Sequence, residues 1–193
     1  MIIALVSFIV LIALIILMIV LRKMQYDKTH INLLDLSDQI GGKVIRKSFA
    51  NQPVFQGNYN GGILQISFSK DKIGSEHVYY INFSMGISVK STVTITSKRW
   101  LQAMDESDNL NTENTVSIDG FVLRSTNKTL LKNLSESNKM QSILQKLEPF
   151  AYLLISPDGL LFDKQSTDIL ADTHVDKMKS TITDLADLVT IGF

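Results

Sequence analysis

The sequence contains no cysteine, only three prolines and one tryptophan, and it carries no net charge, with 19 basic and 19 acidic residues. The absence of cysteine excludes disulfides, thiolate metal sites and the lipidated cysteine of a lipoprotein. When Arg22 and Lys23, which flank an N-terminal apolar run, are taken from the 19 basic residues, residues 24–193 keep 17 basic and 19 acidic residues. This balance excludes the clustered basic surface expected of a nucleic-acid-binding protein.

The long hydrophobic run that is present covers residues 1–21, in which Ser7 is the only polar side chain. As a helix the run would span roughly 31 Å, close to the thickness of the hydrocarbon core of a bilayer. A cleaved signal peptide would have a basic start, a shorter apolar core and a small-residue cleavage site. We therefore predict an uncleaved transmembrane helix over residues 1–22 that contacts the lipid bilayer through residues 1–21. Its alanines and Ser7 do not form a small-xxx-small face, which favours a lipid-facing tether.

Basic residues lie on one side of this run only. Arg22, Lys23 and Lys28 follow its C-terminal end, whereas the other end offers only the α-amino group. The positive-inside rule then predicts a single-pass protein with its N-terminus outside and its globular domain in the cytoplasm. A domain facing the periplasm or the extracellular space is the alternative. Three basic residues are fewer than the four to eight typical of lipid-headgroup recognition, so we interpret them as a topology signal.

The rest of the chain is predicted to form one α+β domain. Residues 23–30 read as a polar juxtamembrane connector, and residues 31–193 as a single globular domain. The domain begins with a short amphipathic helix over Ile31–Ile40, which Gly41 and Gly42 end. Strands come first and helices later, which favours an antiparallel meander sheet with C-terminal helices over a parallel βαβ arrangement.

Alternating apolar and polar residues predict four or five strands between Lys43 and Lys98, with Asn60-Gly61 as a tight turn. Turn residues predict two further hairpins, around Asp119-Gly120 and Pro157-Asp158-Gly159. Apolar residues spaced by three and four predict helices. These helices cover Trp100–Met104, Lys128–Leu134, Asn138–Leu147 with Ser137 as N-cap, and Thr173–Val189 with Thr173 and Asp176 as a capping pair.

No residue pattern supports a catalytic, cofactor-binding or metal site. His30, His77 and His174 lack a partner at metal-ligand spacing. The acidic segment Asp105–Glu113 fails the EF-hand pattern at its sixth and twelfth positions, which leaves an irregular calcium site as the open alternative to a solvated loop. Extended residues follow Gly57, Gly61 and Gly62, so these glycines serve turns rather than a phosphate loop.

Two groups of turn and core residues resemble a loose group of bacterial single-pass membrane-anchored domains of unknown function. The first group is Gly41-Gly42 with Pro53-Val54-Phe55-Gln56-Gly57-Asn58-Tyr59-Asn60-Gly61-Gly62. The second is Asp119-Gly120-Phe121-Val122-Leu123-Arg124-Ser125 with Leu130-Leu131 and Ile143-Leu144. The resemblance covers roughly residues 37–165 and implies architecture and anchoring but no activity.

The anchor and the lack of catalytic patterns favour a protein-interaction or scaffold module with a protein partner at the membrane. One alternative is an accessory subunit of a larger membrane complex, whose helix would pack against other helices. Another is a membrane-bound enzyme with a site assembled from residues distant in sequence, which a pocket with converging acidic or histidine side chains would favour.

Overall fold

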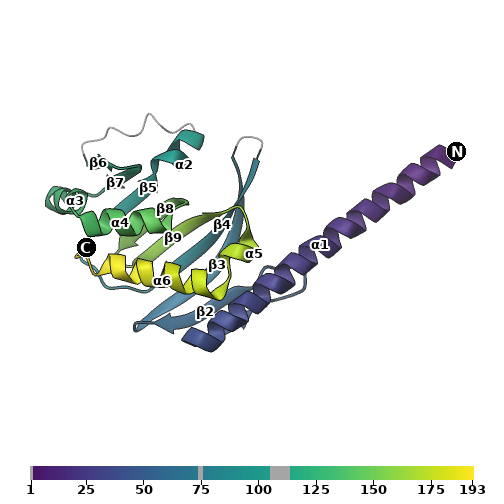
Figure 1. The fold of residues 1–193 in the computed structure, drawn as a ribbon, viewed down its shortest axis with the longest axis horizontal. Coiled ribbons are helices and arrows are strands. Elements are labelled where there is room, and N and C mark those ends of the chain that lie inside the picture. Colours follow the sequence, from purple (N-terminus) through teal and green to yellow (C-terminus); the bar gives the residue numbers. More distant parts are fainter. Residues whose placement is uncertain (1, 74–75, 105–113) are drawn as a thin grey trace.

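A computed structural model describes residues 2–73, 76–104 and 114–193. Over these residues the chain forms a nine-stranded antiparallel sheet with helices on one face, and one long helix extends far beyond the sheet (Figure 1). The predicted α+β fold class, with an N-terminal apolar helix and C-terminal helices, is confirmed. The acidic segment Asp105–Glu113, considered above as an irregular calcium site, lies outside the described residues.

The strands lie in the order β1-β2-β3-β4-β9-β8-β5-β7-β6. They are β1 (Lys43–Ile45), β2 (Val54–Tyr59), β3 (Gly62–Ile73), β4 (Glu76–Met85), β5 (Val93–Ser97), β6 (Thr115–Ile118), β7 (Phe121–Arg124), β8 (Phe150–Ser156) and β9 (Gly159–Ser166). The first four strands form the predicted meander. The fifth does not continue it, because β4 pairs with β9, and β5 lies between β8 and β7.

The hairpin of β8 and β9 occupies the middle of the sheet because most of its side chains on the helix-covered face are apolar, with Lys164 as an exception. Leu153, Ile155, Leu160 and Phe162 are completely buried there. Phe162 contacts Phe83 of β4 and Phe150 of β8, with ring centroids 5.8 and 5.4 Å apart. Such a hairpin is more stable between two strands than at an edge, where its apolar residues would meet water.

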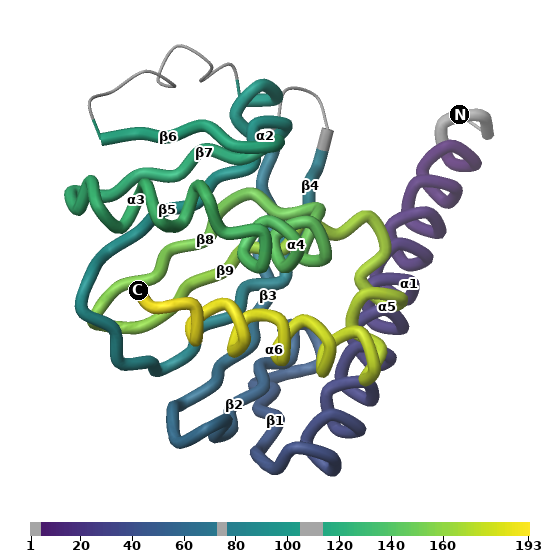
Figure 2. Tube along the Cα trace, turned by 60° about the vertical axis from the view of Figure 1, so that its left-hand side comes forward, coloured from purple at the N-terminus to yellow at the C-terminus, as the bar shows by residue number. Residues whose placement is uncertain are grey.

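The helices are α1 (Ile2–Ile40), α2 (Lys98–Ala103), α3 (Lys128–Ser135), α4 (Asn138–Leu147), α5 (Ile169–Asp172) and α6 (Val175–Val189). Figures 1 and 2 both show α6 lying between α4 and the C-terminal half of α1 over one face of the sheet. The predicted N-cap of α4 is confirmed, since the Ser137 hydroxyl accepts a hydrogen bond from the Met140 amide.

The prediction of a connector at residues 23–30 is wrong in its conformation, because α1 passes through this segment without a break. The segment contains neither glycine nor proline, so nothing in it ends a helix. Its polar composition reflects a helix with one docked face rather than a loop: Tyr26 and Thr29 are buried while Lys23 and Lys28 are exposed. The predicted helix over Ile31–Ile40 is the end of this same helix.

The predicted capping role of Thr173 is also wrong. Helix α6 begins at Val175, two residues later than the predicted start at Thr173, and its N-cap residue His174 makes no side-chain cap. Thr173 instead ends α5, and its hydroxyl donates a hydrogen bond to the carbonyl of Ile169 at 2.7 Å. The four-residue helix α5 is too short for a periodic pattern to reveal it.

Candidate functional site

The C-terminal half of α1 is docked on the domain through one buried stripe. Tyr26, Thr29, Leu33 and Leu36 recur every three or four residues and are between 0 and 7% exposed. They face the sheet and α6, whereas the described side chains from Leu5 to Leu21 are exposed. One rigid helix therefore joins the apolar N-terminal run directly to the hydrophobic core of the domain.

Polar side-chain contacts fix the position of α1 on the domain. The Asn32 amide donates to the hydroxyl of Thr173 at 2.9 Å and to the carbonyl of Leu170 at 3.1 Å. On the other side, Arg46 of the β1–β2 connection forms a 2.6 Å ion pair with Asp27. These contacts join α1 to two segments far apart in sequence, so the helix is held against both rotation and sliding.

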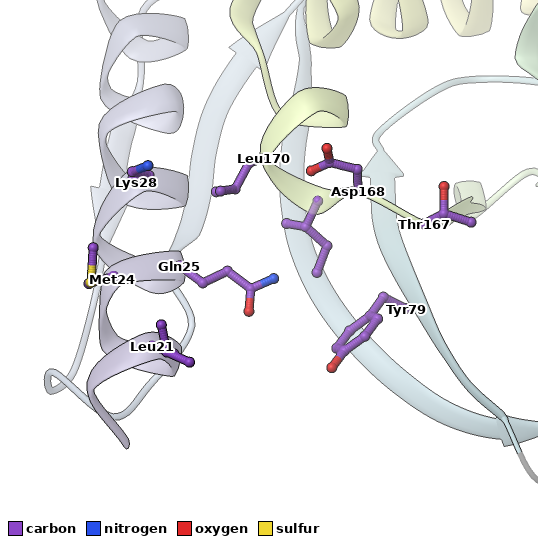
Figure 3. Close-up of a pocket in the computed structure, with 9 residues that line it drawn as sticks. Leu21, Met24, Gln25, Lys28, Tyr79, Thr167, Asp168 and Leu170 are labelled. Atoms are coloured by element: carbon purple, nitrogen blue, oxygen red, sulfur yellow. The ribbon is translucent and has the colours of Figure 1, made fainter. Parts of the chain in front are cut away.

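A pocket lies where α1 emerges from the domain, and Figure 3 shows it between α1, α5 and β4. Its volume is about 300 Å³. Leu21, Met24, Gln25 and Lys28 line it from α1, and Tyr79 lines it from β4. The remaining lining residues come from α5 and the residues before it, and they are Thr167, Asp168, Ile169 and Leu170. In Figure 3 the Gln25 side chain projects from the helix into the space between α1 and Tyr79.

Of the three basic residues predicted as a topology flank, one lines this pocket. Lys28 lines it, Lys23 is exposed, and Arg22 donates to the Tyr26 hydroxyl at 2.8 Å with its guanidinium 5.3 Å from the ring centroid. Two lysines that the sequence analysis missed join them from β3. The Lys70 ammonium lies 5.3 Å from the ring centroid of Tyr79, and the exposed Lys72 lies two residues further along β3.

The face of the sheet opposite α1, α4 and α6 is largely polar, and we refer to it as the open sheet face. On it the Asn82 amide donates to the Asp163 carboxylate at 2.6 Å, and the Trp100 indole donates to the Tyr80 hydroxyl at 3.1 Å. Leu161 of β9 is an exception, since 46% of its surface is exposed on this face.

A cluster of charged residues surrounds Lys164, below the C-terminal end of α4. Its ammonium donates to the carbonyl of Leu147 at 3.2 Å, and Asp172 accepts from both Lys177 and Ser166, at 3.1 and 2.8 Å. Burial lowers the pKa of Lys164 from its ordinary value of 10.5, against the opposing effect of Asp172. We interpret the cluster as structural, because its groups satisfy one another and the end of a helix.

The lowered pKa of Lys164 predicts a pH dependence of stability. Below its folded-state pKa, Lys164 is charged in both states and the full cost of burying the charge opposes folding. Between that pKa and 10.5 the unfolded chain binds the proton more tightly, so this group makes the free energy of unfolding rise with pH. Thermal unfolding of the protein and of Lys164→Met is measured from neutral pH to 10.5. The Tm of the unmodified protein should increase with pH relative to the Tm of the variant. A constant difference between the two Tm values would contradict the assignment.

The predictions of no metal and no catalytic site are not tested by a structure without ligands. In the described part of the chain, no group of three or more histidine, aspartate or glutamate side chains could hold a metal ion. His30, His77 and His174 lie on α1, on β4 and just before α6.

No protein-family model matches the chain, and no curated protein sequence matches it. Among solved structures, the fold is similar to that of the mycobacterial trehalose monomycolate transport factor A, TtfA, with a TM-score of 0.53 and 11% sequence identity. The similarity covers 86% of this chain and 96% of that chain. At this identity the comparison shows a common fold. The predicted resemblance to bacterial anchored domains is therefore confirmed in part. The chain has a fold similar to that of a mycobacterial protein, and its N-terminal helix is apolar.

Proposed function

We propose that the chain is a single-pass membrane protein whose α+β domain binds a protein partner at the membrane surface. The observation that carries the proposal is the continuity of α1. Over the described residues this helix is long and apolar enough to cross a bilayer, and the same helix ends in the core of the domain. A domain joined in this way cannot rotate freely about its anchor, so one of its surfaces faces membrane neighbours at a fixed height and orientation.

We propose that the domain lies on the cytoplasmic side, with the N-terminus outside. Arg22, Lys23 and Lys28 all lie within seven residues of the end of the apolar run. Basic residues close to a membrane helix favour retention on the cytoplasmic side.

The open sheet face is the surface we assign to the protein partner. It lies opposite the helices that bury the core, and its exposed Leu161 offers an apolar anchor among polar groups. The fold is similar to that of TtfA, a transport factor. This similarity supports one version of the proposal, that the chain is an accessory subunit of a larger membrane complex. Among the described residues no cluster of acidic or histidine side chains favours the enzyme alternative.

Replacing Leu161 with aspartate should remove the partner without unfolding the domain. The side chain is 46% exposed, so a carboxylate there stays hydrated when the protein is alone but would be desolvated in an interface. After detergent solubilisation from the native membrane, we expect the full chain to co-purify with an integral membrane protein. Recovery of that protein with Leu161→Asp should fall about tenfold, the effect of losing an interface anchor.

Phe49→Asp is the matched control, because Phe49 is 65% exposed in the connection between β1 and β2. It introduces the same charge at an exposed apolar position outside the open sheet face and should leave recovery unchanged, with the same Tm as the unmodified protein. An equal loss with both variants, or isolation of the chain as a lone monomer, would contradict the proposal.

A further inference from the structure

The pocket at the base of α1 lies at the level of lipid headgroups if α1 crosses the bilayer, a premise that comes from the proposed function. Its lining starts at Leu21, the last residue of the apolar run, and continues to Lys28. Seven residues of helix rise roughly 10 Å. The headgroup region on each side of a bilayer is about 5–8 Å thick, so the pocket opens directly into it.

The pocket is continuous with the lipid-facing surface of the helix. Leu21 and Met24 line it and are also more than half exposed, so they belong both to the pocket and to the surface that meets lipid. Ile169 and Leu170 complete an apolar wall on the opposite side. The glycerol and upper acyl region of a lipid fits such a wall, because both present methylene groups next to polar ones.

The rim of the pocket is basic, and its charges come from two elements. Lys28 lines the pocket, and Lys70 and Lys72 extend from β3, whose pairing with β4 brings Lys70 opposite Tyr79. Figures 1 and 2 show that this end of the β3–β4 hairpin points to the same side of the molecule as the N-terminus of α1. Arg22 and Lys23 lie on the same helix but do not line the pocket, so the rim consists of Lys28, Lys70 and Lys72.

Among the side chains that the structure describes, two carboxylates lie close to this rim. Asp168 lines the pocket and accepts a hydrogen bond from the Ala171 amide, and Asp71 accepts one from the Lys72 amide at 2.7 Å. Asp27 is paired with Arg46 at 2.6 Å. The three rim lysines therefore outnumber these two carboxylates.

We propose that this pocket binds an anionic phospholipid, with the lipid phosphate at Lys28, Lys70 and Lys72 and its glycerol region against Leu21 and Met24. The bound lipid fills the angle between the helix and the domain. It thereby fixes the distance of the domain from the bilayer and makes that distance depend on the anionic content of the leaflet.

Photo-crosslinking of the full chain in nanodiscs tests the proposal. A benzophenone amino acid at Thr167, an exposed residue of the pocket lining, reports the lipids that enter the pocket. The discs contain four parts of phosphatidylcholine to one part of phosphatidylglycerol, and mass spectrometry gives the ratio of the two lipids in the adducts. Since each lysine near an anionic surface is worth about fivefold in lipid partition, we expect phosphatidylglycerol to exceed its bulk share at least fivefold.

The triple variant Lys28→Gln, Lys70→Gln, Lys72→Gln should bring the adduct ratio at Thr167 back to the bulk composition. A matched triple variant, Lys128→Gln, Lys132→Gln, Lys139→Gln, removes the same charge from α3 and α4 and should keep the enrichment. Adducts at bulk composition in the unmodified protein, or enrichment that survives in the rim variant, would overturn the lipid site.

A benzophenone at Leu14, in the middle of the apolar run, tests independently whether α1 lies in the bilayer. Lipid adducts at Leu14 with none at Thr167 would overturn the pocket proposal and leave the anchor intact. An absence of lipid adducts at Leu14 would overturn the anchor and the lipid site together.

Discussion

Replacing Gly62 with alanine should lower the free energy of unfolding by about 2–4 kcal/mol and the Tm by roughly 5–15 °C. Gly62 begins β3, and the carbonyl oxygen of Gly86 lies 1.8 Å from the position that a Cβ would take. The Gly86 carbon follows at 2.8 Å, so the clash is with backbone and no side chain can rotate to relieve it. The Gly86 amide also donates to the Ile63 carbonyl at 2.7 Å, and alanine at 62 would force these segments apart.

Gly120→Ala is the matched control for this prediction. Gly120 lies in the β6–β7 turn with a φ of +86°, and a Cβ there meets no atom within 4 Å. Its substitution should therefore cost only the backbone penalty of a left-handed residue, about 1–2 kcal/mol. Thermal unfolding followed by the fluorescence of the single tryptophan measures both variants. If Gly62→Ala costs no more than Gly120→Ala, the close approach of the two backbones does not exist.

The sequence identifies turns and periodic helices but not close approaches between distant segments. Asn60-Gly61 is predicted as a tight turn, and both residues have positive φ, at 50 and 83°. The neighbouring Gly62 looks like part of the same turn, yet the structure shows that its requirement comes from Gly86, 24 positions later in the chain. No local pattern carries that information, because it depends on how two strands meet.

The candidate lipid site was missed for the same reason. Its basic rim combines Lys28 with Lys70 and Lys72, and a count of basic residues near the helix in sequence finds too few of them. The pairing of β3 with β4 and the docking of α1 bring the two groups to one end of the domain. Local periodicity does predict α4 with its Ser137 cap, because a cap and an apolar stripe are properties of ten consecutive residues.

Residues 23–30 show how polar composition can be misleading in the opposite direction. A polar segment after a membrane run resembles a flexible linker, but only every third or fourth residue must be buried for a helix to dock. Tyr26 and Thr29 supply that stripe, and Leu33 and Leu36 continue it in the next segment. The periodic pattern of buried residues can be recognised only when residues 23–30 and 31–40 are treated as one continuous helix.

Replacing Leu33 with aspartate should separate the C-terminal half of α1 from the domain while the apolar run stays in the bilayer. Leu33 is completely buried in the core cluster with Leu36 and Phe55. Loss of the leucine alone is worth about 2–5 kcal/mol, and burying an unpaired carboxylate adds to that cost. Undocking of the helix exposes the carboxylate to water, and we expect it because it disturbs fewer contacts than unfolding of the nine-stranded sheet.

Pulsed electron paramagnetic resonance measures the undocking directly, because the chain has no cysteine and accepts two spin labels without background. Labels at Asp38→Cys on α1 and Lys139→Cys on α4 should give one narrow distance distribution in the unmodified background and a broad one with Leu33→Asp. Leu34→Asp is the matched control, since Leu34 is the next residue and is 42% exposed. A broad distribution with Leu33→Asp and a narrow one with Leu34→Asp would support docking through the buried stripe. Narrow distributions in both variants would contradict the role of Leu33 in the docking, and a broad distribution in the unmodified background would mean that α1 does not orient the domain.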